Sequence, residues 1–280
     1  MHEKVAVVTG SATGIGYETS LLLARSGFHT CATTRNLERA RSLISVKEKE
    51  GLPIDIFQLD VNDDESIQNT FSEIERNFGK IDILVNNAGY GLLGSFEDLS
   101  FVELKEQFET NFFGAIKIMQ RVLPSMRLQK SGTIVNISSG AGIVGFPCMS
   151  AYASTKFALE GLSESIAFEL LPLGIRVIIV EPGVIRTDFI KHSITAERAA
   201  SKNSPYFNIF QKIYKNINFM QQHATPPADV AKVILNAIND TKPNLRYLVG
   251  NDVAVVAEAK KSLPEAEFRR MMIQQIFQEL

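Results

Sequence analysis

The chain has 280 residues, of which 45% are hydrophobic and 21% are charged. This composition is typical of a globular protein with a full core, and it excludes long disordered, collagen-like and coiled-coil chains. One large α/β domain of ~250 residues would leave about thirty residues over. Twenty-nine basic and thirty-one acidic side chains give a formal net charge of −2, so no overall positive field favours nucleic acid or an anionic membrane as a partner.

The chain holds few residues that suit disulfides or metal sites. Two cysteines, Cys31 and Cys148, cannot build a disulfide framework, and four histidines are scattered without the spacing of metal ligands. No apolar run is long enough for a signal peptide or a membrane-spanning helix. The sequence therefore predicts a soluble, cytoplasmic protein without a bound metal.

Apolar, β-branched runs alternate along the chain with longer amphipathic stretches. The runs predict strands at residues 5–9, 29–33, 54–58, 81–86, 133–138, 176–181 and 246–249, and the stretches predict helices at 15–26, 37–49, 64–78, 101–128, 151–171 and 228–239. The strands are almost continuously apolar, as in a sheet that is covered on both faces. We therefore predict a single-domain α/β Rossmann fold, with a doubly wound, mainly parallel seven-stranded sheet and helices on both faces.

A glycine-rich segment, Thr-Gly-Ser-Ala-Thr-Gly-Ile-Gly at residues 9–16, lies between the first strand and the first helix. At such a position, free backbone amides and the positive end of the helix dipole can hold a dinucleotide pyrophosphate. Gly10 would allow the sharp turn, Gly14 the approach of a phosphate, and Gly16 close packing of the helix. The spacing Gly-x3-Gly-x-Gly differs from the common Gly-x-Gly-x2-Gly fingerprint, and a tight turn without a ligand is the alternative.

Further motifs follow the glycine-rich turn in a fixed order. They are Asp60-Val61, Asn86-Asn87-Ala88-Gly89, Asn111, Ser139, Tyr152-x3-Lys156 and Pro182-Gly183. Together they resemble the short-chain dehydrogenase/reductase family over residues 4–250. Similarity around residues 152–165 and 246–250 extends to the branch that includes hydroxysteroid and retinol dehydrogenases. The resemblance implies an oxidoreductase that interconverts a carbonyl and an alcohol with a nicotinamide cofactor.

The resemblance also implies which residues bind the cofactor. Asp60 and Val61 would frame the adenine ring, and Thr187 would bind the nicotinamide carboxamide. The backbone of residues 87–89 would pass close to the cofactor. The full expected set is Gly10, Ser11, Thr13, Gly14, Ile15, Gly16, Arg35, Asp60, Val61, Asn87, Ala88, Gly89, Tyr152, Lys156, Pro182, Gly183, Val184 and Thr187.

The end of the second predicted strand determines the expected cofactor. An acidic residue there usually binds the adenosine ribose and favours NAD, but this chain has Thr34 followed by Arg35. A guanidinium offers paired donors that match a phosphate, so Arg35 predicts NADP(H) in preference to NAD(H). Arg39, one helical turn later, either assists Arg35 or belongs to a solvated face.

Tyr152 and Lys156 are four residues apart on a predicted helix, so both lie on one face. A free tyrosine has a pKa of ~10, and a nearby ammonium together with the charge of oxidised nicotinamide would lower it toward ~7, which suits protonation of a carbonyl oxygen. By resemblance, Ser139 would bind the substrate oxygen, with Ser138 as the competing choice. Asn111 would hold a water that passes protons to Lys156.

The predicted substrate lid covers about residues 185–225 and contains a helix of its own. Five aromatic side chains recur along it, namely Tyr206, Phe207, Phe210, Tyr214 and Phe219. They either cover an apolar pocket or pack against the domain. Residues 146–149 would line the opposite wall. Both walls favour a bulky, apolar carbonyl compound or alcohol.

Residues 1–250 thus form the predicted catalytic domain, and residues 251–280 form a C-terminal helical extension. Within the extension, Phe268, Met272, Ile276 and Leu280 recur every four residues. This apolar face packs on its own subunit, contacts a second subunit or contacts a lipid surface, and the sequence leaves these alternatives open. Because the predicted helices 101–128 and 151–171 commonly pair subunits in the family, a homodimer or homotetramer is expected.

The sequence as a whole predicts an NADP(H)-dependent carbonyl reductase or alcohol dehydrogenase. Its expected catalytic residues are Asn111, Ser139, Tyr152 and Lys156, with Tyr152 as the general acid and base. The alternative is an NADP(H)-binding redox sensor that keeps the fold but has lost the chemistry. The expected partners are the cofactor, a small apolar substrate and further copies of the chain.

Overall fold

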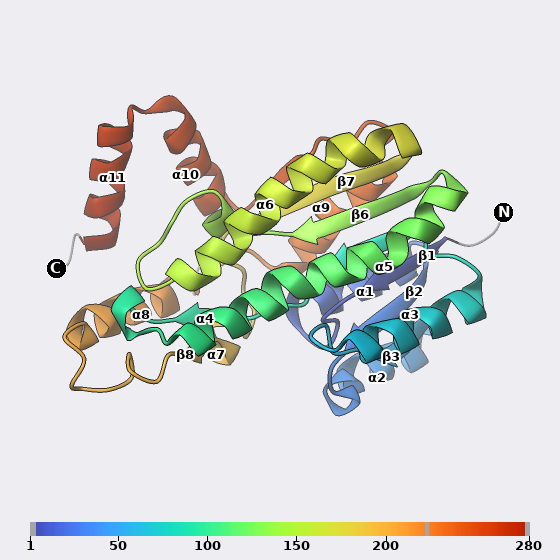
Figure 1. The fold of residues 1–280 in the computed structure, drawn as a ribbon, viewed down its shortest axis with the longest axis horizontal. Coiled ribbons are helices and arrows are strands. Elements are labelled where there is room, and N and C mark those ends of the chain that lie inside the picture. The colour runs from blue at the N-terminus through green and yellow to red at the C-terminus, as the bar shows by residue number, and fades with distance from the viewer. Residues whose placement is uncertain (1–3, 222–223, 278–280) are drawn as a thin grey trace.

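The computed structural model describes residues 4–221 and 224–277, and Figure 1 shows its elements. Seven parallel strands form one sheet in the order β3-β2-β1-β4-β6-β7-β9. Their bounds are β1 Val5–Val8, β2 His29–Thr34, β3 Ile54–Gln58, β4 Ile83–Asn86, β6 Gly132–Ile137, β7 Ile175–Pro182 and β9 Arg246–Val249. This sheet confirms the predicted fold class and contains all seven predicted strands.

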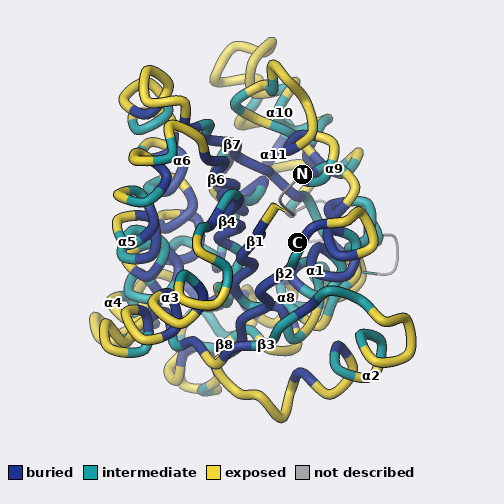
Figure 2. Tube along the Cα trace, turned by 90° about the vertical axis from the view of Figure 1, so that its right-hand side faces the viewer, coloured by how far each residue is buried: buried dark blue, intermediate teal, exposed yellow. Residues whose placement is uncertain are grey.

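Helices cover both faces of the sheet, as Figure 2 shows. One face carries α3 (Asp64–Phe78), α4 (Phe101–Phe108), α5 (Gly114–Gln129) and α6 (Ser150–Leu170). The other carries α1 (Gly14–Arg25), α2 (Arg41–Glu50) and α9 (Pro227–Asn239). The strands supply the core of both layers because successive side chains point to opposite faces. In β1, Val5 and Val7 pack against α3 and α5, while Ala6 and Val8 pack on the side of α1 and α9.

The predicted helix at residues 101–128 is interrupted. A π-helical turn, Glu109–Phe113, separates α4 from α5. The prediction of one continuous helix was therefore wrong in its middle, because apolar spacing does not distinguish a single wide turn from the regular helix around it. The predicted helix at 37–49 likewise begins as the 3₁₀ turn Leu37–Ala40 before α2 starts.

The long connection after β7 is organised by short elements. It contains α7 (Phe189–His192), β8 (Ile194–Thr195) and α8 (Phe207–Met220). Strand β8 pairs in parallel with β5 (Leu92–Leu93), which follows β4, so the connection is tied to a loop at the carboxyl edge of the main sheet. The sequence predicted the helix here but not this two-stranded sheet.

The C-terminal segment forms two further helices, α10 (Asn251–Ser262) and α11 (Glu265–Phe277). They make a hairpin at the end of the molecule toward which the main strands point, opposite α8 (Figure 1). Leu280, the last residue of the predicted apolar repeat, lies outside the described residues. Among the residues that are described, no helix is both long and apolar enough to cross a membrane.

The start of α1 leaves no room for side chains. Gly10 and Gly14 have φ values of +69° and +60°, in the left-handed region that favours glycine. A Cβ on Gly16 would overlap the Gly10 carbonyl oxygen and approach Asn87 Nδ2 to 2.5 Å. The glycines therefore fix the path of the chain from β1 into α1.

Replacing Gly16 by alanine should lower the free energy of unfolding by about 2–3 kcal/mol, since the new methyl group meets backbone that cannot move freely. Gly161→Ala is the matched control, because its Cβ in α6 would meet no atom within 4 Å. That control should instead stabilise the protein by about 0.5–1 kcal/mol. Urea unfolding of both variants measures the difference, and equal stability would contradict the packing assigned to Gly16.

Candidate active site

A cleft of about 1180 Å³ runs along the carboxyl edge of the sheet. Its walls come from the loops after β1, β2, β3, β4, β6 and β7, and from α6, α8, α10 and α11. Parallel α/β sheets bind ligands at this edge, and the volume exceeds the ~300–1000 Å³ of an ordinary small-molecule pocket. The cleft is therefore large enough for two ligands side by side.

Hydrogen bonds to the loop after β4 hold the glycine-rich turn. Asn87 Nδ2 donates to the carbonyl oxygens of Thr9 (2.9 Å) and Gly10 (3.2 Å). The Thr9 hydroxyl in turn accepts from the backbone N–H groups of Asn87 and Ala88, each at 2.9 Å. The side chain of Asn87 thus has a structural role, and its neighbours Ala88 and Gly89 line the cleft.

The first turn of α1 faces the cleft with its backbone N–H groups, and it contains no acidic residue. Such a turn stabilises a bound anion. Gly10, Thr13, Gly14 and Ile15 line the cleft as predicted, whereas Ser11 is buried beneath it. The Ser11 hydroxyl donates to the Val8 carbonyl at 2.8 Å, so it supports the turn from below. The glycines and free amides fit a pyrophosphate.

The loop after β2 presents cations to the same cleft. Arg35 and Arg39 are exposed and line it, and Thr34 is buried at the end of β2. Within residues 4–221 and 224–277, neither guanidinium has a hydrogen bond or an ion pair. Asp60 and Val61, after β3, line the neighbouring stretch of wall. The Asp60 carboxylate accepts from the Asn62 N–H at 3.0 Å and so shapes its own loop.

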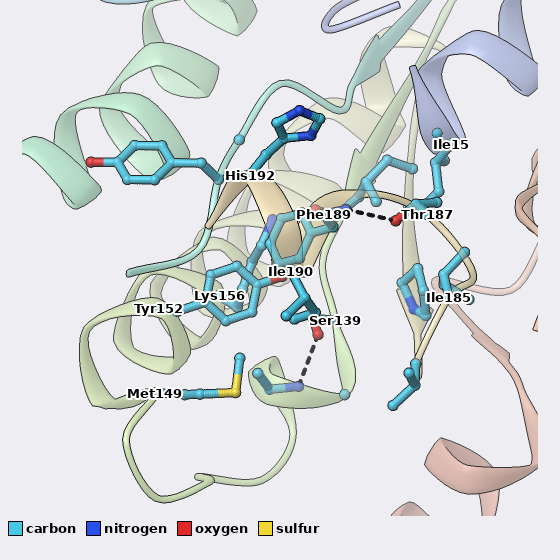
Figure 3. A pocket seen from close by; sticks show the side chains of 18 of the residues that line it. Ile15, Ser139, Met149, Tyr152, Lys156, Ile185, Thr187, Phe189, Ile190 and His192 are labelled. Carbon is cyan, nitrogen blue, oxygen red and sulfur yellow. Dashed lines mark hydrogen bonds between the residues drawn. The ribbon is translucent and has the colours of Figure 1, made fainter. Parts of the chain in front are cut away.

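Tyr152 and Lys156 lie on the first turns of α6 and are almost completely buried, at 7% and 6% exposure. Lys156 Nζ donates to the carbonyl of Ile137, the last residue of β6, at 2.7 Å and lies 5.7 Å from the centre of the Tyr152 ring. Figure 3 shows both side chains on one side of the cleft with Ser139, and Thr187 with Ile15 on the other. The helix and the strand end thus bring the predicted tyrosine and lysine together.

Ser139, and not Ser138, contacts the tyrosine. A hydrogen bond from Ser139 to the phenol oxygen favours the ionised form of Tyr152. The backbone N–H of Ala141 donates to Ser139 Oγ at 3.1 Å and orients it (Figure 3). Ser138 Oγ is buried and has no hydrogen-bond partner within the described part of the chain. The alternation of side chains at the end of β6 therefore decides between the two serines.

Burial is the largest influence on the pKa values of Tyr152 and Lys156. It raises the pKa of Tyr152 to about 12, against the opposing effect of Ser139, and it lowers the pKa of Lys156 to about 8, against the opposing charge of Glu160. The sequence predicted a lowered pKa for Tyr152 when the Lys156 ammonium and oxidised nicotinamide act together, and this stays a prediction. In the protein alone the pKa is raised, because desolvation of the phenolate dominates and the Lys156 ammonium is directed at the Ile137 carbonyl.

Asn111 lies in the π-helical turn, off the cleft wall. Its Oδ1 accepts from the Tyr90 N–H at 3.0 Å and its Nδ2 donates to the Tyr90 carbonyl at 2.8 Å. Nδ2 also approaches Thr155 Oγ1 on α6 at 3.5 Å. The side chain of Asn111 is thus committed to holding the loop after β4 against α6, and a π-turn at this position is common beside functional sites.

The loop after β7 closes the cofactor side of the cleft. Pro182, Gly183, Val184 and Thr187 line the cleft as predicted, and the Thr187 hydroxyl accepts from the Phe189 N–H at 3.2 Å (Figure 3). Sequence reasoning missed Asp252 on α10, whose Oδ2 accepts from the Val184 N–H at 2.6 Å. An acidic residue in the first turn of a helix was the available signal, but it does not point to a loop 68 residues earlier.

Two helical segments form the apolar half of the cleft. Helix α8 contributes Ile213, Asn216, Ile217 and Met220, and the C-terminal helices contribute Val253, Val256, Ala257, Met272, Gln275 and Ile276. None of the five lid aromatics, all of them described, lies on this wall. Phe210 and Tyr214 instead pack in a cluster with Leu92 and Leu93. The aromatic side of α8 therefore anchors the lid to the domain, while its aliphatic side faces the cleft.

Comparison with known proteins identifies the family of the chain. Residues 4–198 match the family model of short chain dehydrogenases. The uncharacterized oxidoreductase YusZ of Bacillus subtilis is 34% identical over 281 residues, covering 99% of this chain and 100% of the relative. Retinol dehydrogenase 8 of Bos taurus is 35% identical over 252 residues, covering 87% of this chain and 80% of the relative.

A crystal structure of a short-chain dehydrogenase from Streptomyces avermitilis superimposes with a TM-score of 0.84 at 31% identity, and covers 99% of this chain and 98% of that one. The resemblance predicted from the motifs is thereby confirmed. The chain belongs to the short-chain dehydrogenase/reductase family, and it is an oxidoreductase that acts on alcohol and carbonyl groups with NAD(P).

Proposed function

We propose that this oxidoreductase uses NADP(H) to interconvert a carbonyl compound and a secondary or primary alcohol of apolar character, with Tyr152 as general acid and base. The observation that carries the proposal is the convergence of Tyr152, Ser139 and Lys156 at one point of the cleft, next to the phosphate-binding turn. These groups stand where a carbonyl oxygen bound in the cleft would meet an acid and a hydrogen-bond donor.

The cofactor would be held along the carboxyl edge of the sheet. The amides of the glycine-rich turn bind its pyrophosphate, Asp60 and Val61 bind its adenine side, and Thr187 binds its nicotinamide side. Bound NADPH supplies the hydride for carbonyl reduction. The remaining proposed contacts are those predicted for Gly10, Thr13, Gly14, Ile15, Asn87, Ala88, Gly89, Pro182, Gly183 and Val184, all of which line the cleft.

Tyr152 donates the proton to the substrate oxygen while Ser139 donates a hydrogen bond to the same oxygen. A phenol with a raised pKa keeps its proton at neutral pH. When it gives the proton to the substrate, the phenolate that forms must be stabilised by positive charge. Lys156 supplies that charge and would also hold the nicotinamide ribose. Asn111 acts indirectly, by fixing the loop after β4 against α6.

Tyr152→Phe removes the proton donor but leaves the shape of the cleft. Turnover of a carbonyl substrate should fall by about 10²–10⁴-fold, the usual contribution of general acid catalysis. NADPH binding, followed by cofactor fluorescence, should remain as in the wild type. Tyr90→Phe is the control, since Tyr90 also lines the cleft and its contacts with Asn111 are made by its backbone, which the substitution keeps.

Near-normal turnover by the Tyr152 variant would remove the tyrosine from the mechanism. If instead the wild type binds NADPH yet reduces no ketone or aldehyde in a broad panel, the alternative of an NADP(H)-binding redox sensor would be supported.

The preference for NADP(H) rests on the end of β2. Arg35 and Arg39 project from this strand end into the cleft, and no acidic side chain follows Thr34 before Glu38. A carboxylate at this point would repel the additional phosphate of NADP(H), whereas a guanidinium binds it with charge-assisted hydrogen bonds.

Arg35→Ala should raise the KM for NADPH by about 10–100-fold, equivalent to losing a hydrogen bond to a charged group, and should leave the KM for NADH almost unchanged. Arg41→Ala removes an exposed arginine of α2 that does not line the cleft, and it should alter neither constant. Steady-state kinetics with both cofactors measures the effect. An equal rise for NADPH and NADH would refute the phosphate contact.

The substrate class rests on the apolar half of the cleft. Aliphatic side chains from α8, α10 and α11 surround it, and Met272 of α11 is almost fully buried there. A bulky apolar body fits such walls better than a sugar, whose hydroxyl groups would lack partners.

Met272→Asp places a charge in this wall and should raise the KM for decanal, an apolar aldehyde, at least about tenfold, since it removes apolar contact and adds a group that must stay hydrated. The KM for NADPH should not change. Ile273→Asp is the matched control, because the neighbouring side chain on α11 is exposed. Equal effects of the two variants on decanal would place the substrate elsewhere.

The assembly and location of the protein are also proposals. Large apolar side chains are exposed on the outer faces of α4, α5 and α6, among them Phe101, Leu128 and Phe168. Burial of these side chains would be favourable in a homodimer or homotetramer formed through the three helices. A cytoplasmic location fits two cysteines that are buried and unpaired.

A further inference from the structure

A cluster of charged side chains lies behind the catalytic lysine, outside the cleft wall. Arg246 of β9 contacts three glutamates, with Nε 3.0 Å from Glu160 Oε2 and 3.7 Å from Glu181 Oε1, and with Nη2 2.7 Å from Glu164 Oε2. Glu160 and Glu181 are buried, at 7% and 3% exposure, while Glu164 is exposed. Buried carboxylates are costly, so a function for the inner pair is worth seeking.

The two oxygens of Glu160 face different surroundings. Oε2 binds Arg246, but Oε1 is buried and receives no hydrogen bond from an N–H or hydroxyl group of the described residues. This oxygen lies 3.4 Å from the point where a Cβ on Gly142 would stand, and Ser138 Oγ lies 2.5 Å from the same point. Glu160 therefore reaches inward, toward the end of β6 that bears Ser138 and Ile137.

Lys156 is the buried cation on that inner side whose charge Glu160 affects. It precedes Glu160 by one helical turn on α6, a spacing at which side chains are neighbours. The hydrogen bond of Lys156 Nζ goes to the neutral carbonyl of Ile137, so Glu160 is the opposite charge that acts on this buried ammonium. The same carboxylate is thus shared between Arg246 at the rim and Lys156 at the catalytic centre.

The other charged groups around this pair are accounted for. On β7, burial, the charge of Glu160 and a hydrogen bond to Glu160 raise the pKa of Glu181 to about 7, so this carboxyl group gains a proton, which it shares with Glu160, as the pH falls through that value. On α10, Lys260 donates to the Ile143 carbonyl and Asp252 accepts from the Val184 N–H, so both are engaged with backbone groups. Arg246 contacts both Glu160 and the exposed Glu164, so one guanidinium faces two carboxylates and negative charge is left over beside Lys156.

We propose that Glu160 is a positioning residue that keeps Lys156 protonated during carbonyl reduction, a role that rests on the proposed function. Lys156 must carry its charge to stabilise the phenolate of Tyr152, and burial opposes that charge. Glu160 offsets part of the energetic cost of burying the Lys156 ammonium. It acts from the side of Lys156 away from the cleft, without touching the substrate or the cofactor.

The direction of the expected pH effect follows from the lysine. Its ammonium is present below a pKa of about 8 and is lost as the pH rises through that value. Burial lowers the pKa of Lys156 and the charge of Glu160 raises it. Neutralising Glu160 should therefore lower this pKa further, so that the ammonium is lost at lower pH. The rate of carbonyl reduction falls at high pH, and this fall should move to lower pH in the same way. The rate at a pH well below the fall should change little.

Glu160→Gln is the direct test, since glutamine keeps the shape and an acceptor for Arg246. NMR titration of isotopically labelled lysine side chains, with Lys156 assigned by its loss in Lys156→Arg, measures the lysine without any substrate. Its pKa should fall by about one unit, at the lower end of what an opposite charge within ~4–6 Å exerts. Decanal reduction against pH, at saturating NADPH, should show the same shift.

Glu164→Gln is the matched control. It removes the shorter contact to Arg246 on the same helix but leaves the neighbour of Lys156 in place, so the Lys156 titration should not move. An ion pair that only joins α6 to β9 predicts similar loss of thermal stability in both variants and no shift in either titration.

A Lys156 titration in Glu160→Gln that coincides with the wild type would overturn the proposal. Glu160→Asp, which withdraws the charge by one methylene group, should give an intermediate pKa and carries the test if the glutamine variant does not fold. A shifted lysine titration in a protein that reduces no carbonyl compound would retain the electrostatic role and reject the proposed function, so the two failures are distinguishable.

Discussion

The burial of the Lys156 ammonium is the constraint on which the proposed catalytic centre depends. Removing such a charge from water costs several kcal/mol unless other groups compensate for it. Here the compensation comes from the Ile137 carbonyl at 2.7 Å and from Glu160. The carbonyl is available because β6 ends at this residue, and the helix that bears Lys156 places Tyr152 one turn earlier. The lysine is thereby fixed against the end of a strand.

The order of strands explains how the rest of the cleft is assembled. Because β1 lies between β2 and β4, the glycine-rich turn has the loop with Arg35 on one side and the loop with Asn87 on the other. The amide of Asn87 then joins two neighbouring loops by binding the carbonyls of Thr9 and Gly10. Residues that are distant in sequence become neighbours since all parallel strands end at the same edge.

The strands and motifs could be predicted from sequence, and many contacts could not. Apolar runs mark the seven strands because each is buried on both faces. Spacing cannot report the π-helical turn at Asn111, whose side chain binds the backbone of Tyr90 instead of lining the cleft. Nor does any local pattern connect Glu160 with Arg246, which are 86 residues apart. The direction of the Tyr152 pKa also required the structure, since burial can be judged only after packing is known.

The residues beyond the seventh strand are better described as part of the catalytic unit than as an appendage. The Asp252 carboxylate accepts a hydrogen bond from the Val184 N–H, and a Cβ on Gly183 would overlap this carboxylate. The start of α10 therefore packs closely against the loop after β7. Val253 lies against Gly140 in the loop after β6. Met272 and Ile276 then extend the same segment along the apolar wall. One hairpin thus touches the loops proposed to hold the cofactor and the wall proposed to hold the substrate, and a change in its position would alter both at once.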